Sequence, residues 1–341
     1  MKKRSVLKRI LLGFAAAVLA LLLPVGVIFL NMAVRVDSPS AGYVWNERLE
    51  FDKGLGPVVE MNGKALKIML FTDQHYTRVF GDRKADRLFN YLVGAHNPDL
   101  IILLGDQCFT PFNRAAYKRL IKTIDAKKIP WAPIFGNHDG DGKATKNRLA
   151  QMLSESSYCL FRYGPENFGG AGNYFINLKD GGDYVYTFYL FDSGKEQKGG
   201  YPPLSAGQVK WYEWAINGMA ATGGGIVPSS VMVHIPLREY TPAYDEAVAG
   251  GSVIYGKRGE EDLPSKINSG MFDKIIELGS TKSVFCGHEH LNDYSVEYKG
   301  VRLTYALSSG YGSYGNKKIK GCTILTVGTD GTMQQAPVYY N

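Results

Sequence analysis

The chain has 341 residues, a formal net charge of +7 and 45% hydrophobic residues. This length allows one large domain or two small ones, and the composition is that of a globular protein with a full core. Five cations within residues 2–9 supply +5 of the charge, so the rest of the chain carries only +2. Because no basic stripe interleaved with aromatic residues follows, a nucleic-acid-binding surface is not expected.

The N-terminal 36 residues predict a membrane segment. The basic start is followed by 21 residues without a charge, from Ile10 to Leu30, which matches the hydrocarbon thickness of a bilayer. Cations on one side favour an N-terminus that stays in the cytoplasm. We therefore expect residues 1–36 to form an uncleaved signal anchor, a single-pass helix in the cell membrane that leaves the rest of the chain outside the cytoplasm. Small residues at 38–41 leave signal cleavage and secretion as an alternative.

Residues 37–60 are rich in turn formers and predict a linker, which makes residues 61–341 the folded domain. The domain begins with alternating strands and helices. The expected elements are a strand at 67–73, a helix at 83–95, a strand at 99–106, a helix at 114–128, and a strand and turn at 130–139. Continuously apolar strands in this order predict a parallel sheet that is covered on both faces.

The later part of the chain predicts further strands and a second sheet. Strands are expected at 186–192, 230–236 and 283–287, and the alternating residues 294–328 indicate an antiparallel second sheet. Residues 241–266 are rich in glycine and charge, and we expect them to form a surface segment near the functional site. The four cysteines, 108, 159, 286 and 322, match no zinc-cluster spacing. A disulfide is possible, but we favour small buried side chains.

Five of the six histidines lie in short motifs that suit a metal, most of them at the ends of predicted strands. The motifs are Asp73-Gln74-His75, Gly105-Asp106, Gly136-Asn137-His138-Asp139, His234 and Gly287-His288-Glu289-His290. Imidazole and carboxylate are ligands for divalent transition metals, and open α/β sheets bind ligands at the carboxyl ends of their strands. The sequence therefore predicts a metal site at this edge.

The ordered set of motifs resembles the calcineurin-like metallophosphoesterases, whose pattern is D-x-H, GD, GNH-D/E, a lone His and GH-x-H. The resemblance runs from residue 66 to about 327. It is greatest to a non-purple branch near the purple acid phosphatases, as residues 234–237, 287–294 and 310–315 indicate. It implies an α/β fold, a four-layer α/β/β/α sandwich of two mixed sheets.

The resemblance also implies which residues bind metal. Two divalent or trivalent transition metal ions, Mn, Fe or Zn, are expected as cofactors. By resemblance the ligands of the first metal are Asp73, His75 and His290, those of the second are Asn137, His234 and His288, and the bridging carboxylate is Asp106.

Three residues are implied in catalysis: Asp106, His138 and Asp139. His138 is expected to stabilise the transition state or to protonate the leaving group. Asp139 is expected to orient a neighbouring imidazole, unless it only caps a turn. Purple acid phosphatases have a tyrosine ligand in GDxxY where this chain has Phe109, so the protein is expected not to be purple and an obligatory ferric ion is not implied. The acid and arginine of the GDxVDRG motif of protein Ser/Thr phosphatases are also absent.

The implied function is hydrolysis of a phosphate ester by a hydroxide that bridges the two metals. We favour phosphomonoesters as substrates. A phosphodiesterase or nuclease using the same site is the alternative, so a nucleic acid is expected only as a possible substrate. A non-catalytic, membrane-tethered binding protein is the third hypothesis. The sequence indicates no oligomeric state.

Overall fold

The computed structural model describes residues 13, 14, 18, 20 and 35–340. The chain divides into two units, residues 1–36 and residues 37–341. Apart from four residues, the expected membrane helix lies outside the described residues. Among the residues that are described, no helix has the length and apolar character needed to cross a bilayer. The signal anchor therefore stays a prediction.

One sheet has five strands in the order β12-β11-β2-β3-β4. Their bounds are β2 Leu66–Phe71, β3 Leu100–Leu104, β4 Trp131–Ile134, β11 Gly321–Val327 and β12 Met333–Tyr339. The first three of these strands are parallel, and β11 and β12 add an antiparallel edge. The predicted parallel sheet is thus confirmed, and every residue of β3 and β4 is buried.

The second sheet has seven strands in the order β1-β5-β6-β7-β8-β10-β9. Their bounds are β1 Val58–Glu60, β5 Tyr174–Asp180, β6 Asp183–Leu190, β7 Ser229–Met232, β8 Thr281–Cys286, β9 Ser295–Tyr298 and β10 Val301–Tyr305. Strands β6, β7, β8 and β10 are parallel, β5 pairs antiparallel with β6 and parallel with β1, and β9 pairs antiparallel with β10. Both sheets are therefore mixed, as the resemblance implied.

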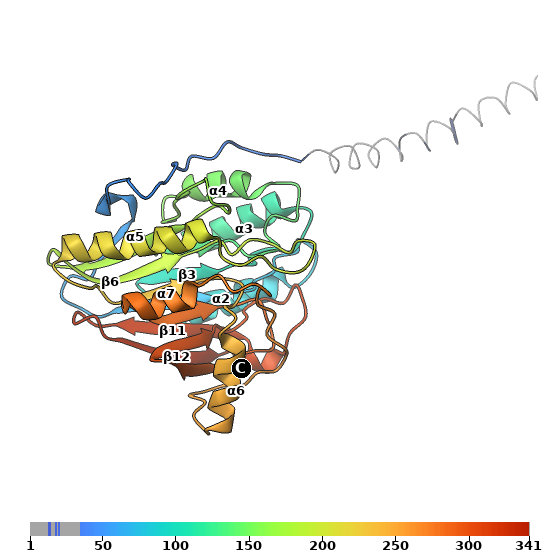
Figure 1. Cartoon of the computed structure of the whole chain (residues 1–341). Coiled ribbons are helices and arrows are strands. Elements are labelled where there is room, and N and C mark those ends of the chain that lie inside the picture. The colour runs from blue at the N-terminus through green and yellow to red at the C-terminus, as the bar shows by residue number, and fades with distance from the viewer. Residues whose placement is uncertain (1–12, 15–17, 19, 21–34, 341) are drawn as a thin grey trace, which may run out of the picture. The chain divides into compact units, whose positions relative to one another are not determined.

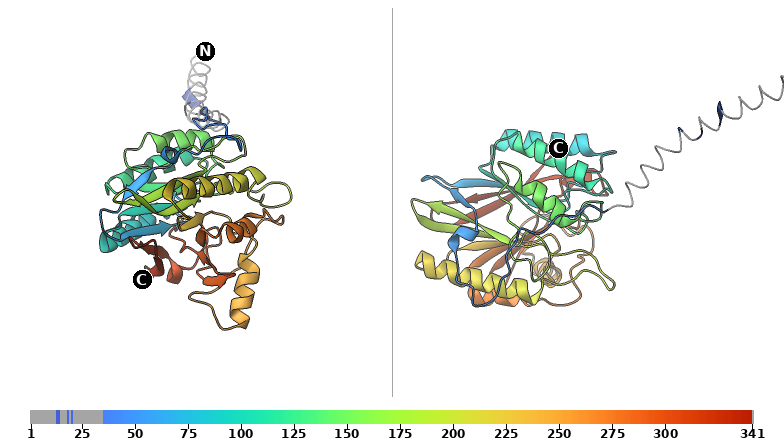
Figure 2. Two further views of the ribbon diagram at one scale, coloured as in Figure 1. Left: turned by 60° about the vertical axis from the view of Figure 1, so that its left-hand side comes forward. Right: turned by 90° about the horizontal axis from the view of Figure 1, so that it is seen from above.

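Helices cover the outer faces of the two stacked sheets. Their bounds are α2 Asp82–His96, α3 Asn113–Asp125, α4 Lys146–Ser154, α5 Ala206–Gly223, α6 Tyr240–Ala249 and α7 Met271–Leu278, with short 3-10 turns η1 Lys53–Leu55 and η2 Lys317–Ile319. Buried residues of α2, α3 and α4 join the core around the five-stranded sheet, and those of α5, α6 and α7 join the other core. Figures 1 and 2 show the two sheets between helices, with α6 projecting away from the sandwich, and this layering confirms the expected sandwich.

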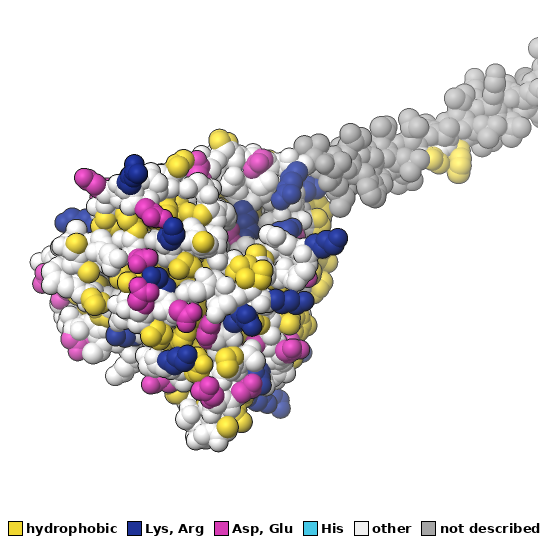
Figure 3. Space-filling view, viewed as in Figure 1, with side chains coloured by type: hydrophobic (Ala, Val, Ile, Leu, Met, Phe, Trp, Pro, Cys, Tyr) yellow, Lys and Arg dark blue, Asp and Glu magenta, His cyan; other side chains and the backbone are white. Residues whose placement is uncertain are grey.

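The helices form where apolar residues recur every three or four positions. In α2, one stripe is buried and packs on the sheet; it consists of Ala85, Leu88, Phe89, Leu92 and Val93. The helix ends at Asn97, whose left-handed backbone (φ 46°) caps it through a bond to the carbonyl of Val93. On the face in Figure 3, cations and anions are interspersed rather than gathered in a basic stripe.

The prediction of a separate antiparallel sheet over residues 294–328 is wrong. β9 and β10 form an antiparallel pair, but β10 also pairs in parallel with β8 in the seven-stranded sheet. β11 instead joins β2 in the five-stranded sheet. Alternation reports that one face of a strand is buried, but it does not specify the partner strand. The loop between Tyr305 and Gly321 carries the chain from one sheet to the other.

The residues expected to form the linker and the surface segment contribute to the folded unit. Within 37–60, β1 pairs in parallel with β5, and Trp45 is buried against Phe168 and Trp214. Residues 241–266 begin with most of α6, part of which is buried. The domain boundaries themselves stay predictions. All four cysteines are free and buried, so the described structure forms no disulfide.

Candidate metal centre

The seven predicted ligands lie in loops at the carboxyl ends of strands from both sheets. From the five-stranded sheet, β2 is followed by Asp73 and His75, β3 by Asp106 and β4 by Asn137; from the seven-stranded sheet, β7 is followed by His234 and β8 by His288 and His290. Side chains from two sheets therefore meet at one edge of the sandwich.

Four of the ligands, in three of these loops, have a left-handed backbone conformation. The φ angles are 52° at Asp73, 44° at His75, 52° at Asp106 and 80° at His288. Such angles cost free energy in residues other than glycine, and they are concentrated at functional sites. The backbone is thus shaped to turn these side chains inward.

Two motif glycines are required because the loops touch. A Cβ on Gly136 would overlap the carboxylate oxygen Oδ1 of Asp106. A Cβ on Gly287 would overlap the hydroxyl oxygen of Thr72. No larger residue fits either position without moving backbone that carries ligands.

The first set of ligands centres on Asp73. Its Oδ2 accepts hydrogen bonds from Thr72 Oγ1 (2.9 Å) and from the backbone N–H of His288 (3.1 Å). Its Oδ1 is buried and has no hydrogen-bond partner among the described residues. This oxygen lies 3.3 Å from His290 Nε2 and 3.7 Å from His75 Nε2, and the two nitrogens are 3.0 Å apart. Three ligand atoms therefore face one point.

The second set centres on Asp106. Its Oδ1 accepts the backbone N–H of His138 at 2.8 Å. Its Oδ2 lies 3.6 Å from His75 Nε2 and 3.4 Å from His234 Nε2, and Asn137 Oδ1 is 3.1 Å from that same nitrogen of His234. Asp106 thus stands between the two sets, where a two-metal site needs a shared carboxylate.

Hydrogen bonds on the far side of two imidazoles orient their inner nitrogens. His234 Nδ1 lies 2.8 Å from the carbonyl of Leu104, and His290 Nδ1 lies 2.9 Å from the carbonyl of Tyr314. A carbonyl only accepts, so each Nδ1 donates, and each ring directs its Nε2 at the centre, where this nitrogen can bind a metal in exchange for a proton. At His234 this Nε2 faces the oxygen of Asn137.

The two buried carboxylates favour a positive charge beside them. Burial lowers the pKa of His234, but the carboxylates of Asp106 and Asp73 outweigh burial and raise it to about 10. Burial, together with the charge of His234, lowers the pKa of His288 to about 3. His288 is thus a neutral imidazole, the form that binds metals, and its buried Nε2 has no hydrogen-bond partner in the described structure.

These donors fit metal ions of the expected kind. Asp73, His75 and His290 offer ligand atoms that lie within 4.8 Å of one another, and so do Asp73, Asp106 and His234. The His288 ring lies 5.2 Å from that of His234, outside both groups. Imidazole and carboxylate donors suit Mn, Fe or Zn. The assignment of each ligand to one ion or the other stays a prediction.

His138 lies at the open side of the centre. Its Nδ1 is 2.8 Å from Asp141 Oδ2, and Lys195 Nζ donates to the other oxygen of Asp141 at 3.2 Å. Burial lowers the pKa of His138, but the hydrogen bond with Asp141 contributes to a net rise. About a third of the side chain is exposed. With Nδ1 held by a carboxylate, Nε2 is the nitrogen that can reach a substrate.

Asp139 binds backbone amides, as expected for the alternative in which its side chain caps a turn. Its carboxylate accepts the backbone N–H of Cys108 (3.1 Å) and that of Gly136 (2.8 Å). It is fully buried, and burial raises its pKa to about 6. Asp139 therefore ties together the loops after β3 and β4, and it acts on the centre through their backbones rather than by orienting an imidazole.

Tyr314 supports the ligand His290 from outside. Its ring stacks on the imidazole, with centroids 4.2 Å apart and planes at 19°. Its hydroxyl donates to Glu260 Oε1 (3.0 Å), and that oxygen also accepts the backbone N–H of Leu291 (2.8 Å). Contacts outside the metal ligands fix ligand orientation in this way.

Several residues around the centre were not identified from the sequence. Tyr314 lies in the stretch 310–315, which was used only for the resemblance, and Glu260 lies in the expected surface segment 241–266. Asp141 carried a weak signal, an acid three residues after His138. Lys195 and Tyr201 carried none, because their position depends on how the segment between β6 and α5 folds back across the site.

Comparison with known proteins agrees with this geometry. The model of the family Calcineurin-like phosphoesterase matches residues 66–292, which include all seven predicted ligands. "Probable inactive purple acid phosphatase 29" of Arabidopsis thaliana is 27% identical over 84% of this chain and 80% of its own length. "Phosphatase DCR2" of Saccharomyces cerevisiae is 29% identical over 62% of this chain, which spans only 39% of that protein.

A solved structure shares the fold. The crystal structure of a dimetal phosphatase from Danio rerio superposes with a TM-score of 0.50 at 12% identity, over 81% of this chain and 98% of that one. The family match covers well over half of the 341 residues and contains the whole set of motifs. The chain therefore belongs to the calcineurin-like phosphoesterase family.

Proposed function

We propose that this protein hydrolyses phosphate monoesters with two metal ions held between its two sheets. One observation carries the proposal. Five of the seven predicted ligands form two adjacent sets that share Asp73, and Asn137 contacts the second set through His234. Asp73 Oδ1 and His288 Nε2 are buried without hydrogen bonds. An intact buried set of this kind marks chemistry more often than structure alone.

Two ions bound here would supply Lewis-acid activation of water and neutralise charge on the phosphoryl oxygens. The chain supplies the remaining functions. Asp73 and Asp106 each keep one oxygen fixed by hydrogen bonds and direct the other inward. Asn137 adds a ligand atom without adding negative charge, which keeps the centre attractive to a phosphate. His138 Nε2 gives a proton to the departing alkoxide, while Asp141 holds the ring.

A non-catalytic binding protein is the second candidate, because the Arabidopsis relative is named as inactive. Against it stands the complete set of ligand positions in this chain. The yeast relative is named as a phosphatase. The location outside the cytoplasmic membrane, at the cell membrane or after secretion, rests on the sequence of residues 1–36 and is part of the proposal.

The test is hydrolysis of a simple phosphomonoester and a phosphodiester by the purified full-length protein after loading with Mn, Fe or Zn. We expect phosphate release from the monoester and none from an Asp106→Asn variant prepared in parallel. Activity on the diester alone would replace the monoesterase by a phosphodiesterase. Activity on neither ester, with metal bound, would favour the non-catalytic candidate.

A further inference from the structure

Three aromatic rings stand around the candidate metal centre, each on a different loop. Phe109 follows β3, Tyr201 lies between β6 and α5, and Tyr314 lies between β10 and β11. Together they form what we call the aromatic rim. Phe109 is 46% exposed, Tyr314 is 52% exposed, and Tyr201 is partly exposed. Burying large apolar side chains would stabilise the folded protein. Their exposure beside a polar site therefore suggests that they contact a ligand.

Two rings of the rim touch imidazoles of the candidate site. The Phe109 ring lies 4.6 Å from that of His138, the expected proton donor to the leaving group. The Tyr201 ring lies 4.6 Å from that of His288, at an interplanar angle of 88°. A phosphate at the metals would therefore place its alcohol portion beside these rings.

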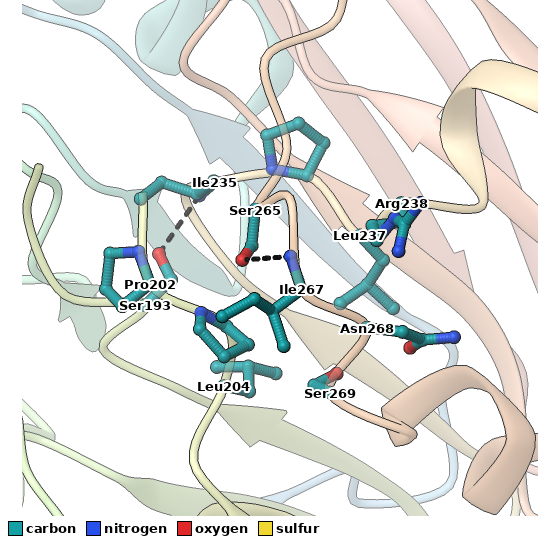
Figure 4. Close-up of a pocket in the computed structure, with 12 residues that line it drawn as sticks. Ser193, Pro202, Leu204, Ile235, Leu237, Arg238, Ser265, Ile267, Asn268 and Ser269 are labelled. Atoms are coloured by element: carbon teal, nitrogen blue, oxygen red, sulfur yellow. Dashed lines mark hydrogen bonds between the residues drawn. The ribbon is translucent and has the colours of Figure 1, made fainter. Parts of the chain in front are cut away.

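The neighbouring pocket is not a rival position for the alcohol portion. Its lining residues come from the chain around 193–204, 235–238 and 265–269, and the backbone N–H of Ile235 donates to Ser193 Oγ (3.0 Å) in its wall, as Figure 4 shows. Its volume is about 20 Å³, which is room for about one water molecule. This pocket therefore does not accommodate a leaving group of more than one or two atoms.

We propose that the aromatic rim, through Phe109 and Tyr201, selects phosphomonoesters whose alcohol carries a flat aromatic group. This inference rests on the proposed function and names its substrate class. Aromatic faces pack edge-to-face or offset against one another, and aliphatic polyols gain little from such contacts. Each ring then contributes about threefold to tenfold in selectivity, the equivalent of an aromatic pair.

The experiment compares benzyl phosphate, butyl phosphate and ethyl phosphate on the full-length, metal-loaded protein. All three release a primary alcohol, so differences in kcat/KM report binding of the alcohol portion rather than the strength of the ester bond. We expect benzyl phosphate to exceed ethyl phosphate by at least about tenfold and butyl phosphate to lie near ethyl phosphate. Phe109→Leu and Tyr201→Leu should each lower the benzyl-to-ethyl ratio by about threefold to tenfold.

Tyr91→Leu is the matched control, because Tyr91 is also an exposed aromatic residue (63% exposed) but lies on α2, where it packs on Tyr340. The benzyl-to-ethyl ratio of this variant should equal that of the wild type. Inhibition of the wild type by benzylphosphonate and ethylphosphonate repeats the comparison without any variant. We expect benzylphosphonate to bind at least about tenfold more tightly.

The outcomes separate the two proposals. Hydrolysis of none of the three esters overturns the phosphoesterase and the rim together. If all three esters are hydrolysed with a benzyl-to-ethyl ratio of kcat/KM near one, only the proposed role of the rim is wrong. The same holds if the Leu variants leave that ratio unchanged. If the Leu variants lose kcat/KM equally on every ester and bind less metal, the rings only support the metal-binding imidazoles. This outcome also contradicts the proposed role of the rim.

Discussion

At the scale of single residues, buried charge defines the centre. Burial raises the pKa of the Asp73 and Asp106 carboxyl groups, but the imidazoles of His290 and His234 outweigh burial and hold both pKa values low. Two buried carboxylates need cations nearby. The motifs predicted which residues take part. They did not predict which atoms face inward, because that depends on carbonyls far away in the sequence, such as that of Leu104 at the end of β3, which orients His234.

Replacing His138 separates proton transfer from metal binding. His138→Ala should lower kcat for an alkyl phosphate by about 10²- to 10⁴-fold, because the departing alkoxide loses its proton donor. The ligand side chains remain, so bound metal measured by elemental analysis should stay at the wild-type level. A kcat within threefold of the wild type would remove His138 from the mechanism.

Replacing Tyr314 tests the support of His290. Tyr314→Ala removes the stacked ring and the contact with Glu260, but it keeps the backbone carbonyl that holds Nδ1. We therefore expect metal affinity to fall by about tenfold, the lower end for supporting contacts. Tyr314→Phe keeps the stack and should recover most of the loss. Competition with a chelating dye gives the affinity, and equal values for Ala and wild type would contradict this role.

At the scale of elements, the parallel strands β2, β3 and β4 were predictable because their apolar runs and intervening helices are local signals. The partners of β9, β10 and β11 were not predictable, because alternation of apolar and polar residues does not specify which distant strand a strand pairs with. The same limit applies to the site. Asp139 was recognised as a motif residue, but its contacts with two loop backbones arise only when β3 and β4 lie side by side.

Asp139 should therefore matter for stability. Asp139→Ala leaves two buried amides without an acceptor, and each costs about 1–3 kcal/mol. We expect the free energy of unfolding to fall by about 2–4 kcal/mol in a denaturant titration. Asp141→Ala, two residues away and partly exposed, is the control and should cost less than about 1 kcal/mol. Equal losses in the two variants would refute the anchoring role.

At the scale of the whole molecule, the centre joins two sheets that also share a hydrophobic core, to which Leu103 of β3 and Phe188 of β6 both belong. Metal bound to side chains from both sheets stabilises the native state by mass action. At a free metal concentration of about 100 times Kd this amounts to about 2.7 kcal/mol, which raises Tm by about 5 °C for a chain of this size.

Removal of metal with a chelator should reverse that gain, and restoring Mn, Fe or Zn should recover it. Differential scanning calorimetry measures both steps. Asp106→Asn, which lacks the shared negative charge, should show a smaller shift than the wild type. A Tm that is indifferent to every one of these metals would mean that the centre does not bind them in the folded protein.

The most direct test of the two-metal phosphoesterase is a titration of the metal-free, full-length protein with Mn²⁺ while hydrolysis of an alkyl phosphate is recorded. The account predicts that hydrolysis rises with added metal and saturates at about two equivalents per chain, as the two-metal arrangement requires. A protein that binds two equivalents and releases no phosphate would contradict it.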